Sequence, residues 1–235
     1  MIPLRDDNPA ALTPLVTVAL IGACTLIFLW QSSLGSEAYK QAVVYGLGFI
    51  PALFFTDIEL PPELVMVPTW FTVFSSMFLH GGFMHLIGNM LYLWIFGNNV
   101  EDSMGHRRFV VFYLACGVIA ALGQSMLNPE SKIPMIGASG AISGVLGAYL
   151  LLFPRAQVEV LIPFGFILQR MRLPALWVLG LWFGMQLLNS VLTSADQGGV
   201  AFVAHASGFV AGMALIPFFK YSHVRLYQST GNRRY

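Results

Sequence analysis

Six polar side chains lie inside stretches of sequence that are otherwise apolar and uncharged. They fall into three pairs: His85 and Asn89, Ser139 and Ser143, and His205 and Ser207. Polar groups within apolar stretches of membrane length are costly, so each of them is a candidate site residue. A lone serine in an apolar helix more often bonds to its own backbone, and this structural explanation stays open for each serine. The chemistry therefore depends on which of these side chains meet.

Ser139 and His205 are the residue types that a serine hydrolase needs. A serine hydroxyl is a weak nucleophile until an adjacent base takes its proton. Histidine suits this role because its ordinary pKa is near neutral. All eleven Asp and Glu residues lie outside the apolar stretches or at their edges, and a carboxylate at mid-membrane costs about 2.5–3.5 kcal/mol or more. We therefore predict a catalytic Ser139–His205 dyad without a carboxylate.

Attack on a carbonyl creates a negatively charged oxygen that needs hydrogen-bond donors. Each preorganised donor is typically worth about 2.7–4 kcal/mol. His85 and Asn89 are four residues apart and share one helix face, so we predict that both contribute to this oxyanion site. The backbone amide of Ser139 is a further candidate, because we expect this residue near a helix N-terminus, where N–H groups are free. Tyr92 continues the same face and is expected to line the cavity.

These residues need a scaffold of membrane-spanning helices. The chain has 235 residues, of which 57% are hydrophobic and 10% charged, whereas a soluble domain is about 25% charged. Uncharged windows of roughly 18 apolar residues predict spanning helices. Six such windows occur, at about 14–30, 81–100, 109–128, 135–153, 174–193 and 199–219. We predict an all-α integral membrane protein, a six-helix bundle that forms one domain over residues 1–235.

The positions of lysine and arginine predict the orientation of the bundle. With a cytoplasmic N-terminus, ten of these residues lie in inside segments, and only Lys40 and Lys132 lie outside. The positive-inside rule therefore places the tails 1–13 and 220–235 in the cytoplasm. The connection at 31–80 then becomes a long extracytoplasmic loop.

Two further inferences follow from this topology. At about 1.5 Å per residue, the four site residues lie roughly 6–12 Å below the outer surface, in one layer. The loop at 31–80 is amphipathic, and we predict that it is a partly embedded interfacial element. Its aromatic residues include Tyr45, Phe49, Phe54 and Phe55.

Small residues predict which helices touch. Gly137, Gly140, Gly144 and Gly147 have helical spacing in the fourth window, and Gly208 and Gly212 form a small-xxx-small pair in the sixth. Such faces let two helix backbones approach closely in lipid. We therefore expect contact between the fourth and sixth helices to bring Ser139 near His205.

Composition also argues against other kinds of function. The net charge of +1 leaves no basic stripe for a nucleic-acid partner. Cys24 and Cys116 lie in separate windows without metal-ligand spacing, so we expect neither a metal nor a disulfide, and no cofactor. The N-terminus lacks the pattern of a cleaved signal peptide, so we expect a retained first helix.

Three short motifs now resemble a known family. The runs His85-Leu-Ile-Gly-Asn89, Gly137-Ala-Ser139-Gly140 and Ala204-His205-Ala-Ser-Gly208 are similar to those of the rhomboid intramembrane serine proteases, in matching order. The resemblance implies a core at about 67–219, with a nucleophile at the head of the fourth helix and its base on the sixth. It assigns these roles to Ser139 and His205, and the oxyanion region to His85 and Asn89. It further implies that the substrates are single-pass transmembrane proteins.

Two positions depart from the family pattern. Many rhomboids have Trp-Arg in the first outer loop, whereas Trp70 is followed here by Phe71. Some members place an aromatic residue four positions after the nucleophile, where it stacks on the histidine. Here that position is Ser143, so another group must orient His205. In the fifth window, Trp177, Trp182 and Phe183 are either a lateral gate or ordinary packing aromatics.

Two other functions compete with a protease. A catalytically inactive relative would bind membrane proteins for quality control, but would be expected to lack the nucleophile or the base. A transporter or channel would have polar groups through the whole membrane depth or broken helices at the midplane, whereas these groups are confined to one layer. We expect a multi-pass protein of a bacterial plasma membrane. The sequence leaves the oligomeric state open.

Overall fold

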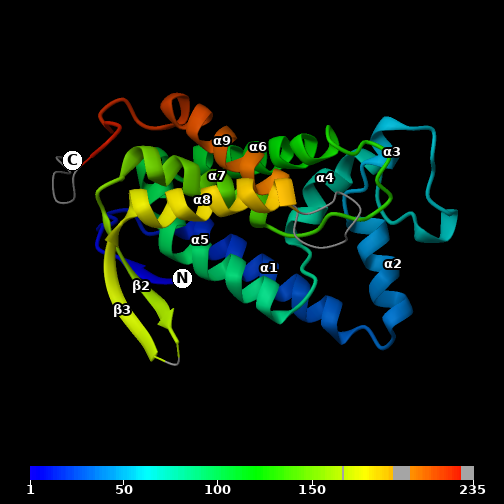
Figure 1. Cartoon of the computed structure of the whole chain (residues 1–235). Helices are drawn as coiled ribbons and strands as arrows, with labels where there is room; N and C mark the ends of the chain where they lie inside the picture. The colour runs from blue at the N-terminus through cyan, green and yellow to red at the C-terminus, as the bar shows by residue number, and fades with distance from the viewer. Residues whose placement is uncertain (166, 193–201, 229–235) are drawn as a thin grey trace.

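The computed structural model describes residues 1–165, 167–192 and 202–228. Six long or central helices correspond in order to the six predicted windows, although the end of the fifth window and the start of the sixth lie outside the described residues. They are α1 (Leu15–Ser33), α5 (Phe83–Met104), α6 (His106–Ser125), α7 (Ser139–Leu152), α8 (Ala175–Leu192) and α9 (Phe202–Phe219). Figure 1 shows them as one bundle with roughly aligned axes.

Not all of these helices are long enough to cross a bilayer. Within the described ranges, four meet the length and hydropathy expected of a span: α1, α6, α8 and α9. The helical turns at 62–78 and α5 form a pair bent by 81°, which makes five spans if the pair counts as one. The 14 residues of α7 rise only about 21 Å against a hydrocarbon core of about 30 Å. The chain is an integral membrane protein, and the count of six spans stays a prediction.

The short helix α7 lies at the centre of the bundle. Ten of its 14 residues are buried, because α5, α6, α8 and α9 all pack against it. Its sequence is apolar on every side, which is typical of a helix enclosed by other helices. The helix that begins with Ser139 is therefore the one that the others hold in place.

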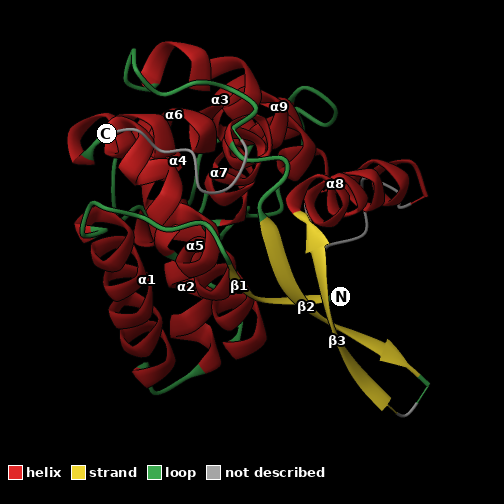
Figure 2. Ribbon diagram, turned by 90° about the vertical axis from the view of Figure 1, so that its left-hand side faces the viewer, coloured by secondary structure: helices red, strands yellow, loops and turns green. Residues whose placement is uncertain are grey.

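The prediction of an all-α chain did not include a small antiparallel sheet. It has the order β1-β2-β3, with β1 (Ile2–Asp6), β2 (Gln157–Phe164) and β3 (Ile167–Pro174). Alternate residues of β2, Val158 and Val160, are fully buried, as expected of a strand with one covered face. Figures 1 and 2 show that β2 and β3 project beyond the helices. The protein remains mostly helical.

The segment from α1 to α5 is partly helical. It contains α2 (Glu37–Leu47), α3 (Ala52–Phe55), α4 (Thr72–Ser75) and short 3-10 turns at Pro62–Leu64, Thr69–Phe71 and Ser76–Phe78. The predicted aromatic set divides in two. Tyr45 and Phe55 are exposed, whereas Phe49 is buried and packs against Phe54 with ring centroids 4.7 Å apart. Contact of this segment with lipid stays a prediction.

The first strand and the segment after α9 lie at one end of the bundle. The amide of Asp7 donates to the Gln157 carbonyl at 3.0 Å, and the amide of Tyr221 donates to the Ser103 carbonyl at 2.9 Å. Gln157 follows the C-terminal end of α7, and Ser103 lies in the last turn of α5. The N-terminal ends of these two helices, at Ser139 and Phe83, lie away from both contacts. This arrangement agrees with tails on one side, while the identity of that side stays a prediction. Arg233 and Arg234, which supported it, lie outside the described residues.

Candidate functional site

The structure brings Ser139 and His205 into direct contact. Ser139 is the first residue of α7, and His205 lies in the first turn of α9. The Ser139 hydroxyl Oγ lies 2.8 Å from Nε2 of His205, within the normal range for a hydrogen bond. His205 is only 9% exposed. A hydroxyl that donates to an unprotonated imidazole nitrogen is the geometry of a nucleophile and its base.

Close packing of α7 on α9 produces this contact. A Cβ atom at Gly208 would overlap the carbonyl oxygen of Gly140, and one at Gly212 would overlap that of Gly144. Gly147 likewise faces the backbone of Phe209. The prediction that small residues let these two helices approach closely is confirmed. Any side chain larger than hydrogen at these positions would push the serine and the histidine apart.

The chain turns sharply just before Ser139. Gly137 has φ +125°, so it lies outside the helix that the glycine spacing had suggested, and α7 begins four residues later than predicted. Its amide donates to the Ser76 carbonyl at 2.9 Å. A Cβ atom at this position would lie 2.8 Å from the imidazole of His85. Glycine therefore satisfies both the backbone conformation and the lack of space, which brings the His85 ring beside the start of α7.

His85 and Asn89 lie on the first turns of α5 and border the same cavity as Ser139 and His205. Asn89 is 8% exposed, and its amide nitrogen is buried without a hydrogen-bond partner among the described residues. A buried donor of this kind ordinarily has a partner. The exposed His85 accepts at Nδ1 from the Gly81 amide at 3.3 Å. The site therefore holds an unsatisfied N–H donor.

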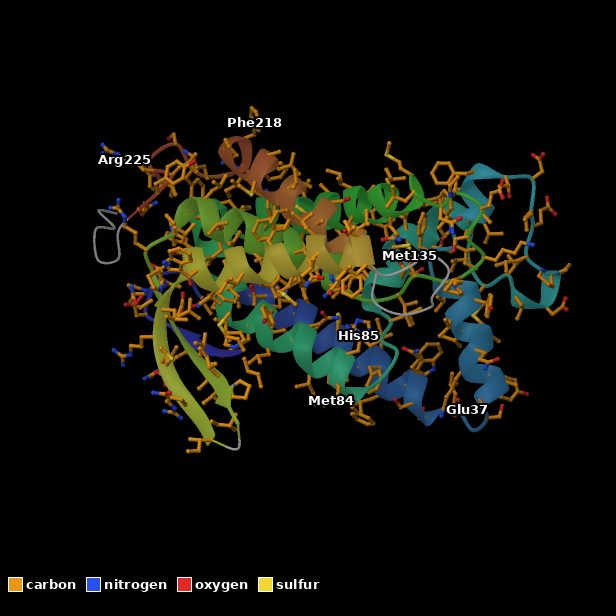
Figure 3. The ribbon with its side chains drawn as sticks, in the orientation of Figure 1. Glu37, Met84, His85, Met135, Phe218 and Arg225 are labelled. Carbon is orange, nitrogen blue, oxygen red and sulfur yellow. The ribbon has the colours of Figure 1, made fainter. Side chains whose placement is uncertain are left out.

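His85 and Met135 both line the cavity. Figure 3 shows these two residues nearer to α2 and α3 than Phe218 and Arg225, which lie toward the opposite end of the bundle. The volume of the cavity is about 1090 Å³, and Tyr92 lines it as predicted. This volume is at the upper limit of pockets for small ligands. It is large enough for a short extended peptide segment.

The other two serines of the sequence prediction have structural contacts. Ser143 Oγ donates to the carbonyl oxygen of Ser139 at 2.6 Å, and the residue is buried at the border of the cavity. Ser207 packs directly against Gly123 of α6. The structural explanation, a bond to the serine's own helix, therefore applies to Ser143, whereas Ser207 has a packing contact.

Two glutamines that the sequence reasoning passed over are part of this site. Gln186 of α8 has Oε1 at 2.9 Å from Nδ1 of His205. Gln124 of α6 accepts the amide of Ala204 at 3.1 Å and so fixes the start of α9. Gln186 lies within the fifth apolar window, and its polarity there was the available signal. The sequence does not show which group Gln186 contacts, because that depends on how α8 packs against α9.

The aromatic residues of α8 point in different directions. Trp177 is 61% exposed, whereas Trp182 has its ring 6.0 Å from the imidazole of His205. Phe183 stacks on Phe209 with centroids 4.5 Å apart. Trp182 and Phe183 thus pack inward, and a lateral gate on this helix stays a prediction. Within the described ranges, no cluster of three His, Cys, Asp or Glu residues could hold a metal ion.

The sequence of this chain is similar to those of proteins of one family. The Rhomboid domain matches residues 67–222. The chain is 39% identical over 88 residues to the rhomboid protease GluP of Bacillus subtilis, covering 37% of this chain and 17% of that protein. It is 35% identical over 81 residues to the putative rhomboid protease YdcA of the same organism, covering 34% and 40%. It is also 29% identical over 153 residues to the chloroplastic Rhomboid-like protein 11 of Arabidopsis thaliana, covering 63% and 52%. The matches thus span about half the length of these relatives or less.

Proposed function

Because the chain belongs to the rhomboid family, we propose that it is an intramembrane serine endopeptidase. It hydrolyses peptide bonds within or next to transmembrane segments of membrane proteins. One observation carries this proposal: the hydroxyl of Ser139 lies 2.8 Å from Nε2 of the buried His205. The names of the two Bacillus relatives support the same reaction class.

The proposed reaction has two halves. His205 takes the hydroxyl proton at Nε2 while Oγ of Ser139 attacks the scissile carbonyl carbon. The resulting imidazolium gives its proton to the leaving amine as the C–N bond breaks, leaving an ester on Ser139. A water molecule then hydrolyses this ester, with His205 acting again as the base, and the free hydroxyl returns.

The oxyanion site is proposed to consist of Asn89, His85 and the free N–H groups at the start of α7. The unpartnered amide nitrogen of Asn89 is the strongest candidate, because a buried donor without a partner is available for a ligand. Ser139 is the first residue of its helix. Its N–H therefore has no partner within the helix, and the helix dipole favours negative charge there.

The proposed substrates are single-pass transmembrane proteins. A helix in lipid hides each carbonyl in its own hydrogen bonds, so a substrate must unwind locally before attack. The cavity of about 1090 Å³ has room for such an unwound segment, and the bilayer itself is the second partner. We further propose that residues 1–235 form one membrane domain with its core at 67–219. A bacterial plasma membrane is the proposed location, although a chloroplastic relative shows that the family is wider.

The test is cleavage by the purified, reconstituted protein. A model single-pass substrate is incubated with wild type, Ser139→Ala and His205→Ala, and a fluorophosphonate probe reports on Ser139 in parallel. We expect both mutants to lose cleavage and labelling. Ser143→Ala is the matched control, since it removes a neighbouring hydroxyl that donates to the backbone carbonyl of Ser139, and it should retain both.

Two results would contradict the proposal. Cleavage that persists in Ser139→Ala would exclude this nucleophile. A folded wild-type protein that neither cleaves nor reacts with the probe would instead favour the inactive, membrane-protein-binding relative.

A further inference from the structure

Helix α8 contacts the His205 imidazole on the side opposite Ser139. Nδ1 of the imidazole lies 2.9 Å from Oε1 of Gln186. One turn earlier on the same helix, the ring of Trp182 lies 6.0 Å from the imidazole at an interplanar angle of 32°. A single helix, which carries neither the nucleophile nor the base, thus supplies both an acceptor and an aromatic surface to His205.

The Gln186 contact selects one form of the imidazole. A neutral imidazole carries its proton on one nitrogen and accepts at the other. To take the proton of Ser139, His205 must accept at Nε2 and carry its own proton on Nδ1. The carbonyl oxygen of Gln186 can only accept, so its bond favours the Nδ1–H tautomer. We infer that Gln186 is the positioning residue of His205, and that the seating of α8 therefore determines whether the base faces Ser139 in its reactive form.

A neutral amide suits this position better than the carboxylate found in many serine hydrolases. A carboxylate within a membrane bundle is costly to bury. The buried acid of α5, Glu101, lies twelve residues from Asn89 along one helix, a rise of about 18 Å. Gln186 orients the ring without placing a charge beside it. Some relatives have an aromatic residue at the position of Ser143, where it orients the histidine. Here Gln186 takes over that role for His205.

The second half of α8 contacts the rest of the bundle through Trp182, Phe183 and Gln186. Its buried residues are Ala175, Val178 and Leu179, all in its first half. Beyond its first two residues, the Gln186–His205 contact is the one hydrogen bond found between α8 and another element in the described part of the chain. Phe183 on Phe209 is an apolar contact and sets no tautomer. Outward movement of this half of α8 would therefore release the imidazole.

The inference rests on the proposed function for its catalytic consequence, but the tautomer can be measured without any substrate. Full-length protein labelled with ¹⁵N-histidine is reconstituted in bilayers and examined by solid-state NMR. The His205 signals are assigned by their loss in His205→Gln. We expect wild type to show Nδ1–H, and Gln186→Leu, which keeps similar bulk but no acceptor, to gain an Nε2–H population. Met185→Leu is the matched control, since Met185 is 52% exposed on the same helix.

The rate of fluorophosphonate labelling tests the catalytic consequence. Because general-base catalysis contributes about 10²–10⁴-fold, we expect Gln186→Leu to lower the labelling rate at Ser139 by roughly 10- to 100-fold, and to lower kcat with little change in KM. A wild-type labelling rate or an unchanged tautomer in Gln186→Leu would overturn the inference. A wild type with the Nδ1–H signal but without labelling or cleavage would refute the proposed protease and leave the contact standing.

Discussion

The carbonyl oxygen of Gly144 on α7 occupies the space that a Cβ atom of residue 212 on α9 would need. The two backbones touch at this point, five residues along α7 from Ser139 and seven residues along α9 from His205. The distance between the Ser139 hydroxyl and the His205 imidazole therefore depends on the absence of side chains at a contact that includes neither residue. Substitution at this contact separates packing from catalysis.

Gly212→Ala is expected to lower both stability and activity. The added methyl group overlaps backbone that cannot move aside, and overpacking of this kind typically costs about 1–3 kcal/mol. Thermal denaturation in detergent and the fluorophosphonate labelling rate measure the two effects. Gly180→Ala is the matched control, because nothing lies within 4 Å of a Cβ atom there. Equal denaturation midpoints for the two variants would contradict the packing argument.

Asn89→Ala is expected to remove one donor of the oxyanion site while the fold persists. The lost donor should lower kcat for the model substrate by about 10²- to 10³-fold, since its amide nitrogen has no other partner to lose among the described residues. Asn98→Ala takes an amide from the same helix, where it contacts only the backbone of Asn99, and should leave kcat unchanged. A wild-type kcat in Asn89→Ala would exclude this residue from the oxyanion site.

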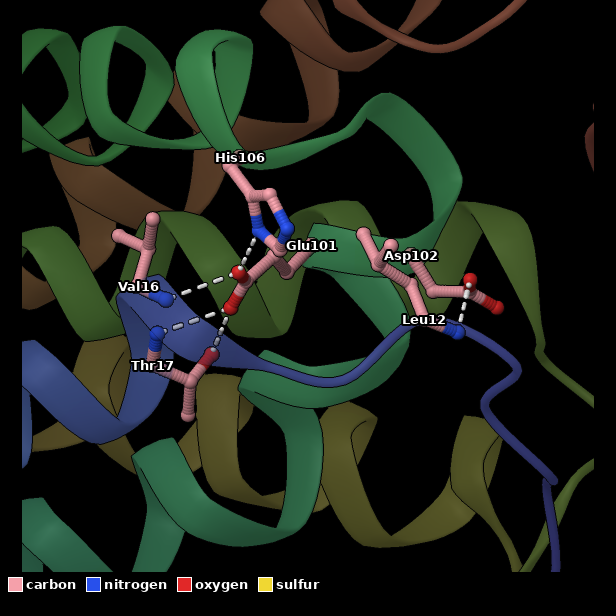
Figure 4. A network of polar contacts seen from close by, with 6 residues as sticks. All are labelled: Leu12, Val16, Thr17, Glu101, Asp102 and His106. Atoms are coloured by element: carbon pink, nitrogen blue, oxygen red, sulfur yellow. Dashed lines mark hydrogen bonds and ion pairs between the residues drawn. The ribbon is translucent and has the colours of Figure 1, made fainter.

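Glu101 joins the start of α1 to the end of α5, as Figure 4 shows. The carboxylate is fully buried. It accepts from the amides of Val16 and Thr17 at 2.9 and 2.8 Å and from the Thr17 hydroxyl at 2.7 Å, and its contact with His106 Nδ1 is 2.6 Å. Glu101→Ala leaves the buried donors of Thr17 and the half-buried donors of Val16 and His106 without this acceptor, and we expect a loss of about 3–5 kcal/mol.

The measurement for Glu101 is the free energy of unfolding or, where unfolding is irreversible, the thermal midpoint. His106→Ala removes one of the four contacts and should cost less than Glu101→Ala. Glu63→Gln changes an exposed acid and is the control. The interpretation fails if Glu101→Ala unfolds at the same midpoint as this control.

Glu159 makes the pairing of the three strands sensitive to acid. Its carboxylate accepts a hydrogen bond from Arg5 Nε at 3.0 Å and forms an ion pair with Arg170, whose Nη1 lies 3.2 Å away. The hydrogen bond from Arg5, with the charges of Arg5, Arg170 and Arg172, lowers the pKa of Glu159 below its ordinary 4.5. Because the folded pKa is lowered, the stabilisation is complete above about pH 4.5 and is lost as the pH falls from there through the folded value.

The Glu159→Gln variant tests this dependence. The difference in thermal midpoint between wild type and Glu159→Gln should be greatest at neutral pH and should shrink below pH 4.5, the ordinary carboxyl value. Glu63→Gln, at an exposed position of the 3-10 turn Pro62–Leu64, should show no such difference at any pH. A midpoint difference that does not change with pH would show that Glu159 does not act through its charge.

The pattern of apolar windows was enough to predict a helical membrane bundle, because a bilayer demands long apolar helices whatever their neighbours. The same pattern singled out Ser139, His205, His85 and Asn89, since polar groups are rare in such windows. The small sheet was missed because β2 and β3 lie between the fourth and fifth windows, where Arg155, Arg170 and Arg172 indicate a connection between spans. Their alternating Val158 and Val160 were the available signal.

What the tertiary structure decided was which polar groups meet. Ser143 and Gln186 are both polar residues in apolar windows, yet one bonds to its own helix and the other to His205. Sequence spacing determines neighbours along one helix, every three or four residues. It does not determine the rotation and closeness of separate helices, which depend on the packing of all their side chains at once. Ser139, His205 and Gln186 come from three different helices, so only the packed bundle determines their contacts.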